Sequence, residues 1–299
     1  MFNYILLAIT IIFSILSCAV ARNNFCKLCM QNDGDLYLFN TISAAISLVT
    51  LFVISLVKRE LCIPSGYTVL LGTLYGISTA LMTLLNMRAL RTGPLSYTNI
   101  IIFCALIIPA LSGKVLYDEP VSAAQYIGVA LMLLSFVLSV DTSQDSKGMN
   151  LRWLLLCLGA FLFNGSLGVM QKLHQNTEWK AQLGVFLLVA FVVYFLICLV
   201  LTLLSRAKGE AMTSFSSPNR NKAIIYVVTS GVGIAVCNQI NTYLAGTMPS
   251  ILFFPLANGG VLLATLLIGF FAWKEKFTSK QWIGLAAGAV SIALVSGLF

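Results

Sequence analysis

Amide side chains inside long apolar segments are the residues of this chain best suited to chemistry. In one segment Asn164, Gly168, Gln171 and Gln175 recur at i, i+4, i+7 and i+11, which places them on one helical face. Lys172 lies beside this face, near the end of the segment. A carboxamide in hydrocarbon without partners costs about 2–7 kcal/mol. We therefore expect this face to hydrogen-bond a polar group and Lys172 to attract an anionic one, unless Lys172 simply reaches to the lipid headgroups.

A second apolar segment carries three amides in four positions, Asn238, Gln239 and Asn241. Because successive helical residues rotate by about 100°, Asn238 and Asn241 can face one cavity while Gln239 points elsewhere. Asn86 corresponds to Asn241 at an offset of 155 residues. We expect Asn86, Asn238 and Asn241 to bind a solute through neutral hydrogen bonds. The alternative for these amides is hydrogen bonding between helices.

Two further segments combine proline with polar side chains. Pro255 removes a backbone hydrogen bond from its segment, and Asn258 follows it. Pro109 lies in a segment that has Tyr97 and Asn99 near its start. We expect Pro109 and Pro255 to act as hinges and Tyr97, Asn99 and Asn258 to complete the binding site, although single prolines are also common in membrane helices.

The elements that position these residues are long apolar helices. Of 299 residues, 59% are hydrophobic and only 9% are charged, and the mean hydropathy is +0.94. A soluble domain carries about 25% charged residues, so the composition predicts an all-α, multi-pass integral membrane protein. The net charge of +8 comes from short loops, which favours contact with membrane lipid and not with nucleic acid. Ten spans are expected at 2–21, 36–57, 67–90, 94–116, 120–140, 151–172, 183–205, 222–245, 249–272 and 279–298.

Cysteine, histidine and acidic residues do not form a recognisable metal site. Cys26 and Cys29 make one CxxC pair, there is no second pair, and His174 is the only histidine. A structural zinc ion needs four ligands, so we expect no metal and no cofactor. Glu119 and Glu275 stand at helix starts, where a carboxylate favours the helix dipole, and no acid lies inside a span. The expected site is neutral and polar with a cationic edge, which suits neutral, zwitterionic or anionic metabolites.

The two halves of the chain resemble each other. A polar linker at 141–150 separates residues 1–140 from residues 151–299, and each half holds five predicted spans. "QYIGVALMLLSFVLS" (125–139) matches "QWIGLAAGAVSIALV" (281–295) at six of fifteen positions with an offset of 156. Because five is an odd number, the second half enters the membrane from the opposite side. Two inverted five-helix repeats are typical of secondary transporters.

At this point the chain resembles the EamA-like branch of the drug/metabolite transporter superfamily. The resemblance rests on two repeats that each end in E-(P/K)-(V/F)-(S/T)-x-x-Q-(Y/W)-I-G, and on "NGSLGVMQKLHQ" in the sixth span. It implies a central cavity lined by spans 1, 3, 4, 6, 8 and 9, with spans 5 and 10 at the periphery. We predict a secondary transporter that moves a small polar, zwitterionic or anionic metabolite across a bacterial-type cytoplasmic membrane, as a monomer or homodimer.

Other classes of protein and both orientations stay open. A lipid-carrier flippase or a non-transporting membrane subunit is the alternative. Enzymes that act on membrane lipids usually carry Asp-rich metal motifs or several His, whereas this chain has one His and no clustered Asp in a span, so no enzymatic activity is expected. With cytoplasmic termini the inside loops would hold only 5 of the 18 Lys and Arg residues. The charge distribution therefore favours external termini, whereas the resemblance implies cytoplasmic ones.

Overall fold

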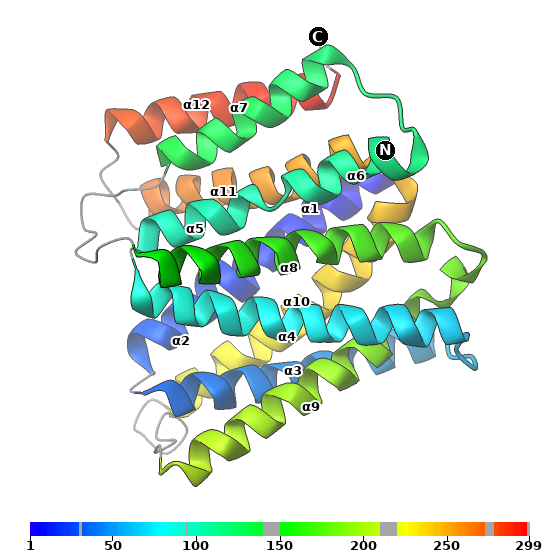
Figure 1. Ribbon diagram of the computed structural model, residues 1–299, viewed down its shortest axis with the longest axis vertical. Helices are drawn as coiled ribbons and strands as arrows, with labels where there is room; N and C mark the ends of the chain where they lie inside the picture. The colour runs from blue at the N-terminus through cyan, green and yellow to red at the C-terminus, as the bar shows by residue number, and fades with distance from the viewer. Residues whose placement is uncertain (30–31, 94, 140–149, 210–219, 273–277, 298–299) are drawn as a thin grey trace. The chain divides into compact units, whose positions relative to one another are not determined.

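The structure is a computed structural model that describes the whole chain except residues 30–31, 94, 140–149, 210–219, 273–277 and 298–299. All regular secondary structure in the described residues is helical (Figure 1). The elements are α1 (Phe2–Ser14), the π-helix η1 (Ile15–Arg22), α2 (Asn23–Leu28), α3 (Asp33–Val57), α4 (Gly66–Thr92), α5 (Leu95–Cys104), α6 (Ile107–Tyr117), α7 (Ala123–Ser139), α8 (Leu151–Gln175), the 3₁₀-helix η2 (Glu178–Gln182), α9 (Leu183–Ala207), α10 (Arg220–Thr247), α11 (Ser250–Ala272) and α12 (Ser279–Val295).

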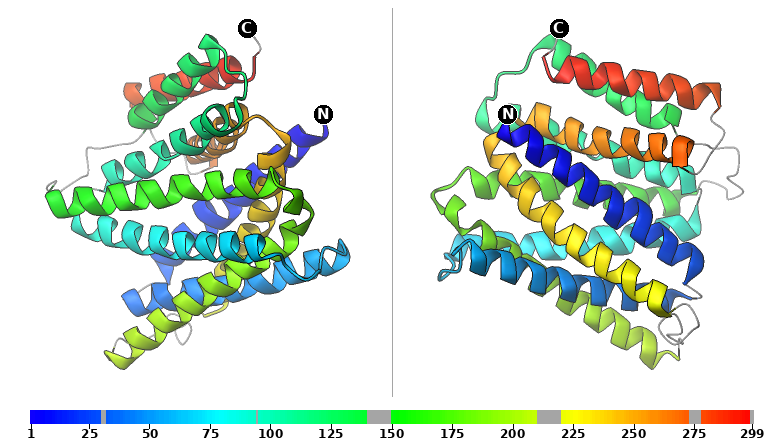
Figure 2. Two further views of the ribbon diagram at one scale, coloured as in Figure 1. Left: turned by 45° about the vertical axis from the view of Figure 1, so that its right-hand side comes forward. Right: turned by 180° about the vertical axis from the view of Figure 1, so that it is seen from behind.

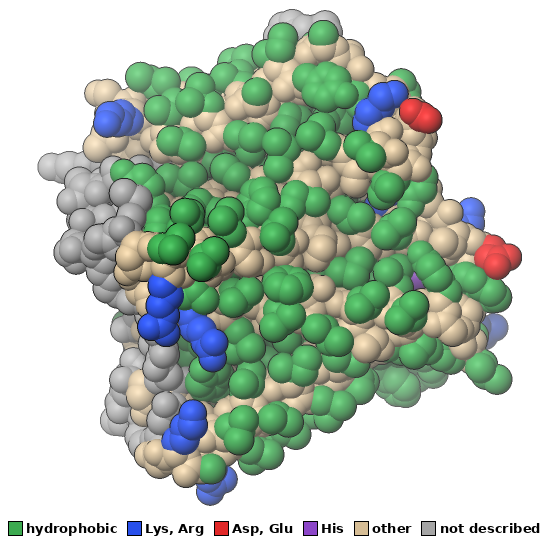
Figure 3. Space-filling model, in the orientation of Figure 1, with side chains coloured by type: hydrophobic (Ala, Val, Ile, Leu, Met, Phe, Trp, Pro, Cys, Tyr) green, Lys and Arg blue, Asp and Glu red, His purple; other side chains and the backbone are tan. Residues whose placement is uncertain are grey.

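Eight helical segments of the described residues are long and apolar enough to cross a membrane, which makes the chain a multi-pass membrane protein. The two remaining apolar helices, α7 and α12, are shorter, with 17 residues each. Large apolar side chains are exposed along the helices, and Figure 3 shows them spread over most of the viewed face. Exposed apolar side chains along a whole helix fit a lipid surface better than water. The predicted all-α membrane class is thereby confirmed.

The chain divides into two compact units, and each contains helices from both halves of the sequence. Unit 1 comprises Met1–Ala80 and His174–Tyr243, and unit 2 comprises Leu81–Leu173 and Leu244–Phe299. The predicted halves, 1–140 and 151–299, therefore each contribute to both units. Each contact described below joins residues of the same unit.

In unit 1, α3 and α9 pack side by side in opposite directions (Figure 1). Thr41 near the start of α3 shares a 2.8 Å hydrogen bond with Thr202 near the end of α9. At the other end of the pair, a Cβ on Gly184 would lie 2.5 Å from Ser55 Oγ. These two helices occupy corresponding places in the two halves of the sequence.

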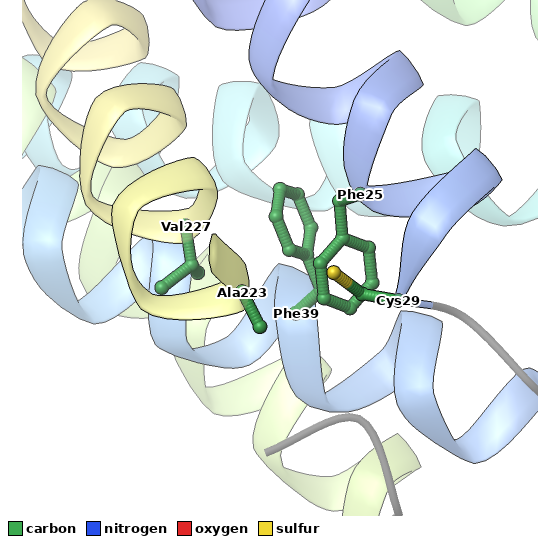
Figure 4. Close-up of a cluster of buried hydrophobic side chains, with 5 residues drawn as sticks. All are labelled: Phe25, Cys29, Phe39, Ala223 and Val227. Atoms are coloured by element: carbon green, nitrogen blue, oxygen red, sulfur yellow. The ribbon is translucent and has the colours of Figure 1, made fainter. Parts of the chain in front are cut away.

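A buried cluster joins α2, α3 and α10 in the same unit (Figure 4). The rings of Phe25 and Phe39 lie 4.3 Å apart, and Ala223 and Val227 pack against them from α10. Cys29 completes the cluster and is 3% exposed. Burial raises the pKa of its thiol, so Cys29 remains protonated and packs as a small apolar side chain.

In unit 2, α7 and α12 exchange the same hydrogen bonds in both directions. Ser135 Oγ donates to Gly284 O at 2.6 Å, and Ser291 Oγ donates to Gly128 O at 2.6 Å. Since the early residues of one helix meet the late residues of the other, the helices run antiparallel. Figures 1 and 2 show them side by side.

Two glutamines extend this exchange to the helix ends. Gln125 Nε2 donates to Val295 O at 3.3 Å, and Gln281 Nε2 donates to Ser139 O at 3.4 Å. Every residue of the α7 set corresponds to one of the α12 set at the offset of 156 found in the sequence. The sequence match therefore marks an interface in which α7 and α12 play equivalent parts.

Equivalent roles predict equal effects of mutation. Ser135→Ala and Ser291→Ala should each lower the free energy of unfolding by about 0.6–2 kcal/mol, because each removes one hydrogen bond between helices. Thermal unfolding in detergent measures the change. Ser166→Ala is the control, since Ser166 Oγ bonds only to Phe163 O of its own helix. Clearly unequal effects of the two variants would contradict the equivalence of α7 and α12.

Two residues other than glycine adopt a left-handed backbone in the described part of the chain, Arg59 (φ 56°) and Asp118 (φ 49°). After α3, Glu60 N donates to Ser55 O and Arg59 N donates to Leu56 O, which forms a Schellman cap around Arg59. Gly209 has φ 80° after α9, the counterpart of α3. Arg59 therefore occupies a position that suits glycine.

Replacing Arg59 by glycine should stabilise the protein by about 1 kcal/mol, because the left-handed conformation costs a side chain about that much. Gly209→Ala should destabilise it by a similar amount, since no described atom lies within 4 Å of a Cβ on Gly209 and backbone strain is what the Cβ adds. Both changes are read as unfolding free energies in detergent. A destabilising Arg59→Gly would show that the Arg59 side chain contributes more than its backbone strain costs.

Candidate functional site

In unit 1, polar side chains connect α1 to α10. Thr10 Oγ1 donates to Asn241 Oδ1 at 2.9 Å, and one turn further along Ser14 Oγ and Cys237 Sγ share a hydrogen bond at 3.2 Å. The two helices lie side by side in the right-hand view of Figure 2. Within the described residues, no group accepts a hydrogen bond from Asn241 Nδ2. The side-chain oxygen of Asn241 thus accepts a hydrogen bond from α1, and its Nδ2 group can donate to another partner.

Asn238 uses a different neighbour. Tyr75 of α4 donates its hydroxyl to Asn238 Oδ1 at 2.7 Å, and Asn238 Nδ2 donates to Ile234 O at 2.9 Å. Gln239 Nε2 lies 3.4 Å from Glu60 Oε2, and its buried Oε1 has no hydrogen-bond partner among the residues that the structure describes. Asn238 and Asn241, predicted to face one cavity, therefore bond to two different helices, α4 and α1. Gln239 points away from both, toward Glu60, as its position on the helix predicts.

In unit 2, Lys172 and Glu119 form a buried ion pair. Lys172 Nζ lies 2.6 Å from Glu119 Oε1, and the two side chains are 5% and 15% exposed. Nζ also donates to Met248 O at 3.2 Å and lies 6.0 Å from the centre of the Tyr117 ring. Lys172, predicted to attract an anionic group, is thus paired with the carboxylate of Glu119. The expected cationic edge is neutral here because a carboxylate from the same chain balances it.

Glu119 also caps a helix, although not its own. Its Oε2 accepts a 2.7 Å hydrogen bond from the backbone N–H of Ser250, the first residue of α11. The start of α7 is capped instead by Ser122 and Gln125, which exchange hydrogen bonds between side chain and backbone. The expectation that Glu119 stabilises the helix following it is therefore wrong. The left-handed Asp118 ends α6 and directs Glu119 back toward α11. Glu275 lies outside the described residues.

The predicted span 94–116 is interrupted at Ala105 and Leu106, between α5 and α6. Pro109 causes the interruption, because it has no N–H to donate to the carbonyl four residues earlier, that of Ala105. Ile108 N donates to Ala105 O instead, at 3.1 Å. The predicted hinge at Pro109 thus coincides with a break in the helix.

Helix α8 packs against this break. Asn164 Nδ2 donates to Ile102 O at 3.1 Å, in the last turn of α5. A Cβ on Gly165 would lie within 3.0 Å of Ile108 and of Ala105 O, and one on Gly168 within 2.9 Å of Pro109 and Phe254. This face of α8 therefore packs against both parts of the interrupted span, α5 and α6.

The second predicted hinge behaves differently. Helix α11 continues without interruption through Pro255. Asn258 is exposed, and its Nδ2 donates to Phe254 O in its own helix at 2.9 Å. Pro255 therefore produces no break of the kind found before Pro109.

The other predicted binding residues of unit 2 differ in exposure. Asn86 on α4 has a buried Oδ1 for which the described part of the chain supplies no hydrogen-bond partner, and Gln171 on α8 is 5% exposed. On α5, Tyr97 is 39% exposed and Asn99 is half-buried. Asn86 Oδ1 is thus an acceptor that a bound solute could satisfy.

Sequence reasoning missed a hydrogen-bond network around His174, which is fully buried in unit 1. Gln175 Nε2 lies 3.1 Å from His174 Nδ1, and Thr68 Oγ1 lies 3.4 Å from His174 Nε2. Thr68 in turn donates to Gln182 Oε1 at 2.7 Å. Gln175, predicted to belong to the polar face of α8, takes part in this hydrogen-bond network. Among the described residues, no group of three or more His, Cys, Asp or Glu side chains could hold a metal ion.

The fold and these polar clusters define an all-α, multi-pass membrane protein. The sequence matches no protein-family profile and no curated protein. Solved structures of 28 chains are similar to it. One of them, described as "Crystal structure of protein", has a TM-score of 0.71 over 98% of this chain and 99% of its own, at 14% identity. At that identity the likeness concerns the fold alone.

The ion pair predicts strongly non-additive effects. Lys172→Met and Glu119→Gln should each lower the unfolding free energy by about 3–5 kcal/mol, because each leaves a buried group without its partner. The double variant should lose much less than the sum of the two. Chemical denaturation in a mild detergent measures the three values. Additive losses would mean that Lys172 and Glu119 stabilise the fold independently.

Proposed function

We propose that the chain is a secondary transporter of the EamA-like type, built from ten spans in two inverted repeats and working by alternating access. The reciprocal hydrogen bonds of α7 and α12 carry this proposal. Two helices that correspond in sequence at one offset, run antiparallel and exchange identical bonds are what a two-fold axis perpendicular to both would generate. When both helices cross the membrane, a two-fold axis perpendicular to them lies in the plane of the membrane.

The other contacts support the same symmetry. The span formed by α5 and α6 corresponds to α11, and α6 packs against α11 just as α7 packs against α12 and α3 against α9. Helix α5 contacts α7, and correspondingly α11 contacts α12. Exchanging the two halves leaves these contacts unchanged, although the contact of α11 with α7 has no equally extensive counterpart between the described residues of the α5–α6 span and α12. Such exchange is the physical basis of alternating access, because each half can adopt the conformation of the other.

The solute would be a small polar, zwitterionic or anionic metabolite, moved across a bacterial-type cytoplasmic membrane. In unit 1, Asn241 offers an amide donor, and in unit 2, Asn86 offers a buried acceptor that has no partner among the described residues. Lys172 offers an ammonium group whose present counterion belongs to the protein. These groups bind hydroxyl, amine, amide and carboxylate functions, whereas no acidic side chain stands free for a cationic drug in the described part of these clusters.

Transport by variants in proteoliposomes tests the proposal. A thermal-shift screen of amino acids, sugar phosphates, nucleobases and choline-like cations would first identify a ligand, because a bound ligand stabilises the fold. Asn241→Leu should then reduce uptake at least about tenfold, since a buried polar group of the solute would lose its partner. Thr202→Val is the matched control, because it removes a buried hydroxyl pair between α3 and α9.

Two outcomes decide the matter. Loss of uptake in Asn241→Leu with retention in Thr202→Val supports both the function and this site. Wild-type uptake in Asn241→Leu and Lys172→Met would eliminate the site assignment, and no movement of any ligand that binds would eliminate the transport function.

A further inference from the structure

The groups that hold Glu119 are those that would recognise a free carboxylate. Lys172 Nζ supplies a cation 2.6 Å from one oxygen, and Ser250 N supplies a backbone donor 2.7 Å from the other. Ser250 begins α11, a helix of 23 residues, whose N-terminus carries a partial positive charge. A cation and a helix N-terminus together make a strong carboxylate site.

This site contains a buried hydroxyl group to which Glu119 makes no hydrogen bond. Ser250 is 1% exposed, and its Oγ has no hydrogen-bond partner in the described residues. A buried hydroxyl without a partner costs about 1–3 kcal/mol, so a site built only to hold Glu119 would be expected to avoid it. Gly113 lies directly against the Glu119 carboxylate and Ser250, and the absence of a Cβ there leaves room for the carboxylate.

Glu119 stands outside the helices, on the segment between α6 and α7. It reaches the site because Asp118 before it adopts a left-handed backbone. The carboxylate is thus carried by a short connection rather than by a packed helix, and moving it requires no helix to unfold.

We propose that Glu119 occupies a carboxylate-binding site formed by Lys172 and the N-terminus of α11, and that the carboxylate of the transported solute takes its place. The proposal deepens the proposed transport function and rests on it. Exchanging one carboxylate for another keeps Lys172 paired throughout, so no buried charge is left alone. Binding of the solute and release of the α6–α7 connection from α8 and α11 are then the same event, and the solute class is narrowed to carboxylates.

Acetate is the probe, and binding is measured by equilibrium dialysis on the purified full chain. Wild type should bind acetate saturably but weakly, because Glu119 competes with it. Glu119→Gln, purified with acetate present, should bind at least about tenfold more tightly, since the competitor is removed. Gly113→Ala should bind acetate less tightly than wild type, because its Cβ would occupy the space of the carboxylate. Glu119→Asp serves if Glu119→Gln does not fold, since its shorter side chain competes less well for the site and it should bind acetate more tightly than wild type.

Two controls complete the experiment. Asp118→Asn neutralises the neighbouring carboxylate, which is 96% exposed, and should bind acetate as wild type does. Adding Lys172→Met to Glu119→Gln should abolish binding.

A purely structural ion pair predicts no saturable acetate binding to wild type or to Glu119→Asp, and that result would overturn the inference. Equal binding of chloride or phosphate would overturn the assignment to carboxylates. If acetate binds as expected but no carboxylate is transported, the proposed function fails while the site stands. Carboxylate transport without acetate binding at this site leaves the function intact and removes the inference.

Discussion

The structure depends on one constraint, which is that polar groups among apolar helices must find partners within the protein. Hydrocarbon supplies no hydrogen bonds, so buried amides, hydroxyls and charges need a partner from a side chain or a backbone group. Among the described residues a few buried atoms, such as Asn86 Oδ1 and Ser250 Oγ, are exceptions. Asn164 caps the carbonyl of a broken helix, Tyr75 occupies the oxygen of Asn238, and Glu119 neutralises Lys172. The polar residues that stand out in the sequence therefore hold helices together before they do anything else.

This double use explains how far the sequence could predict the site. Helix positions follow from apolar length and were found near every predicted span. The offset of 156 located Ser135 and Ser291, which proved to exchange equivalent bonds, because matching side chains in matching helices face matching neighbours. The break before Pro109 followed from a missing N–H. All of these depend on local chemistry or on a direct comparison of two segments.

Contacts between distant segments could not be predicted in this way. Glu119 appeared to belong to the helix that follows it, yet it caps α11, more than 130 residues later. Its direction is set by the left-handed Asp118, and no glycine in the sequence signalled that turn. His174 was considered only as a metal ligand, whereas Thr68, Gln175 and Gln182 tie it into a hydrogen-bond network. Such pairings depend on the packing of helices, which periodicity does not encode.

The pairing of corresponding helices has a consequence for how the protein is made. Helix α3 packs on α9 and α7 packs on α12, so each of these first-half helices has its counterpart in the second half. While the first 140 residues emerge from the ribosome, the faces of α3 and α7 that later become interfaces must rest against lipid or the insertion machinery. Unit 1 cannot close before α10 is inserted, and unit 2 cannot close before α12 is inserted. A truncated chain should therefore be recognised by cellular quality control as incomplete, even though all of its helices have formed.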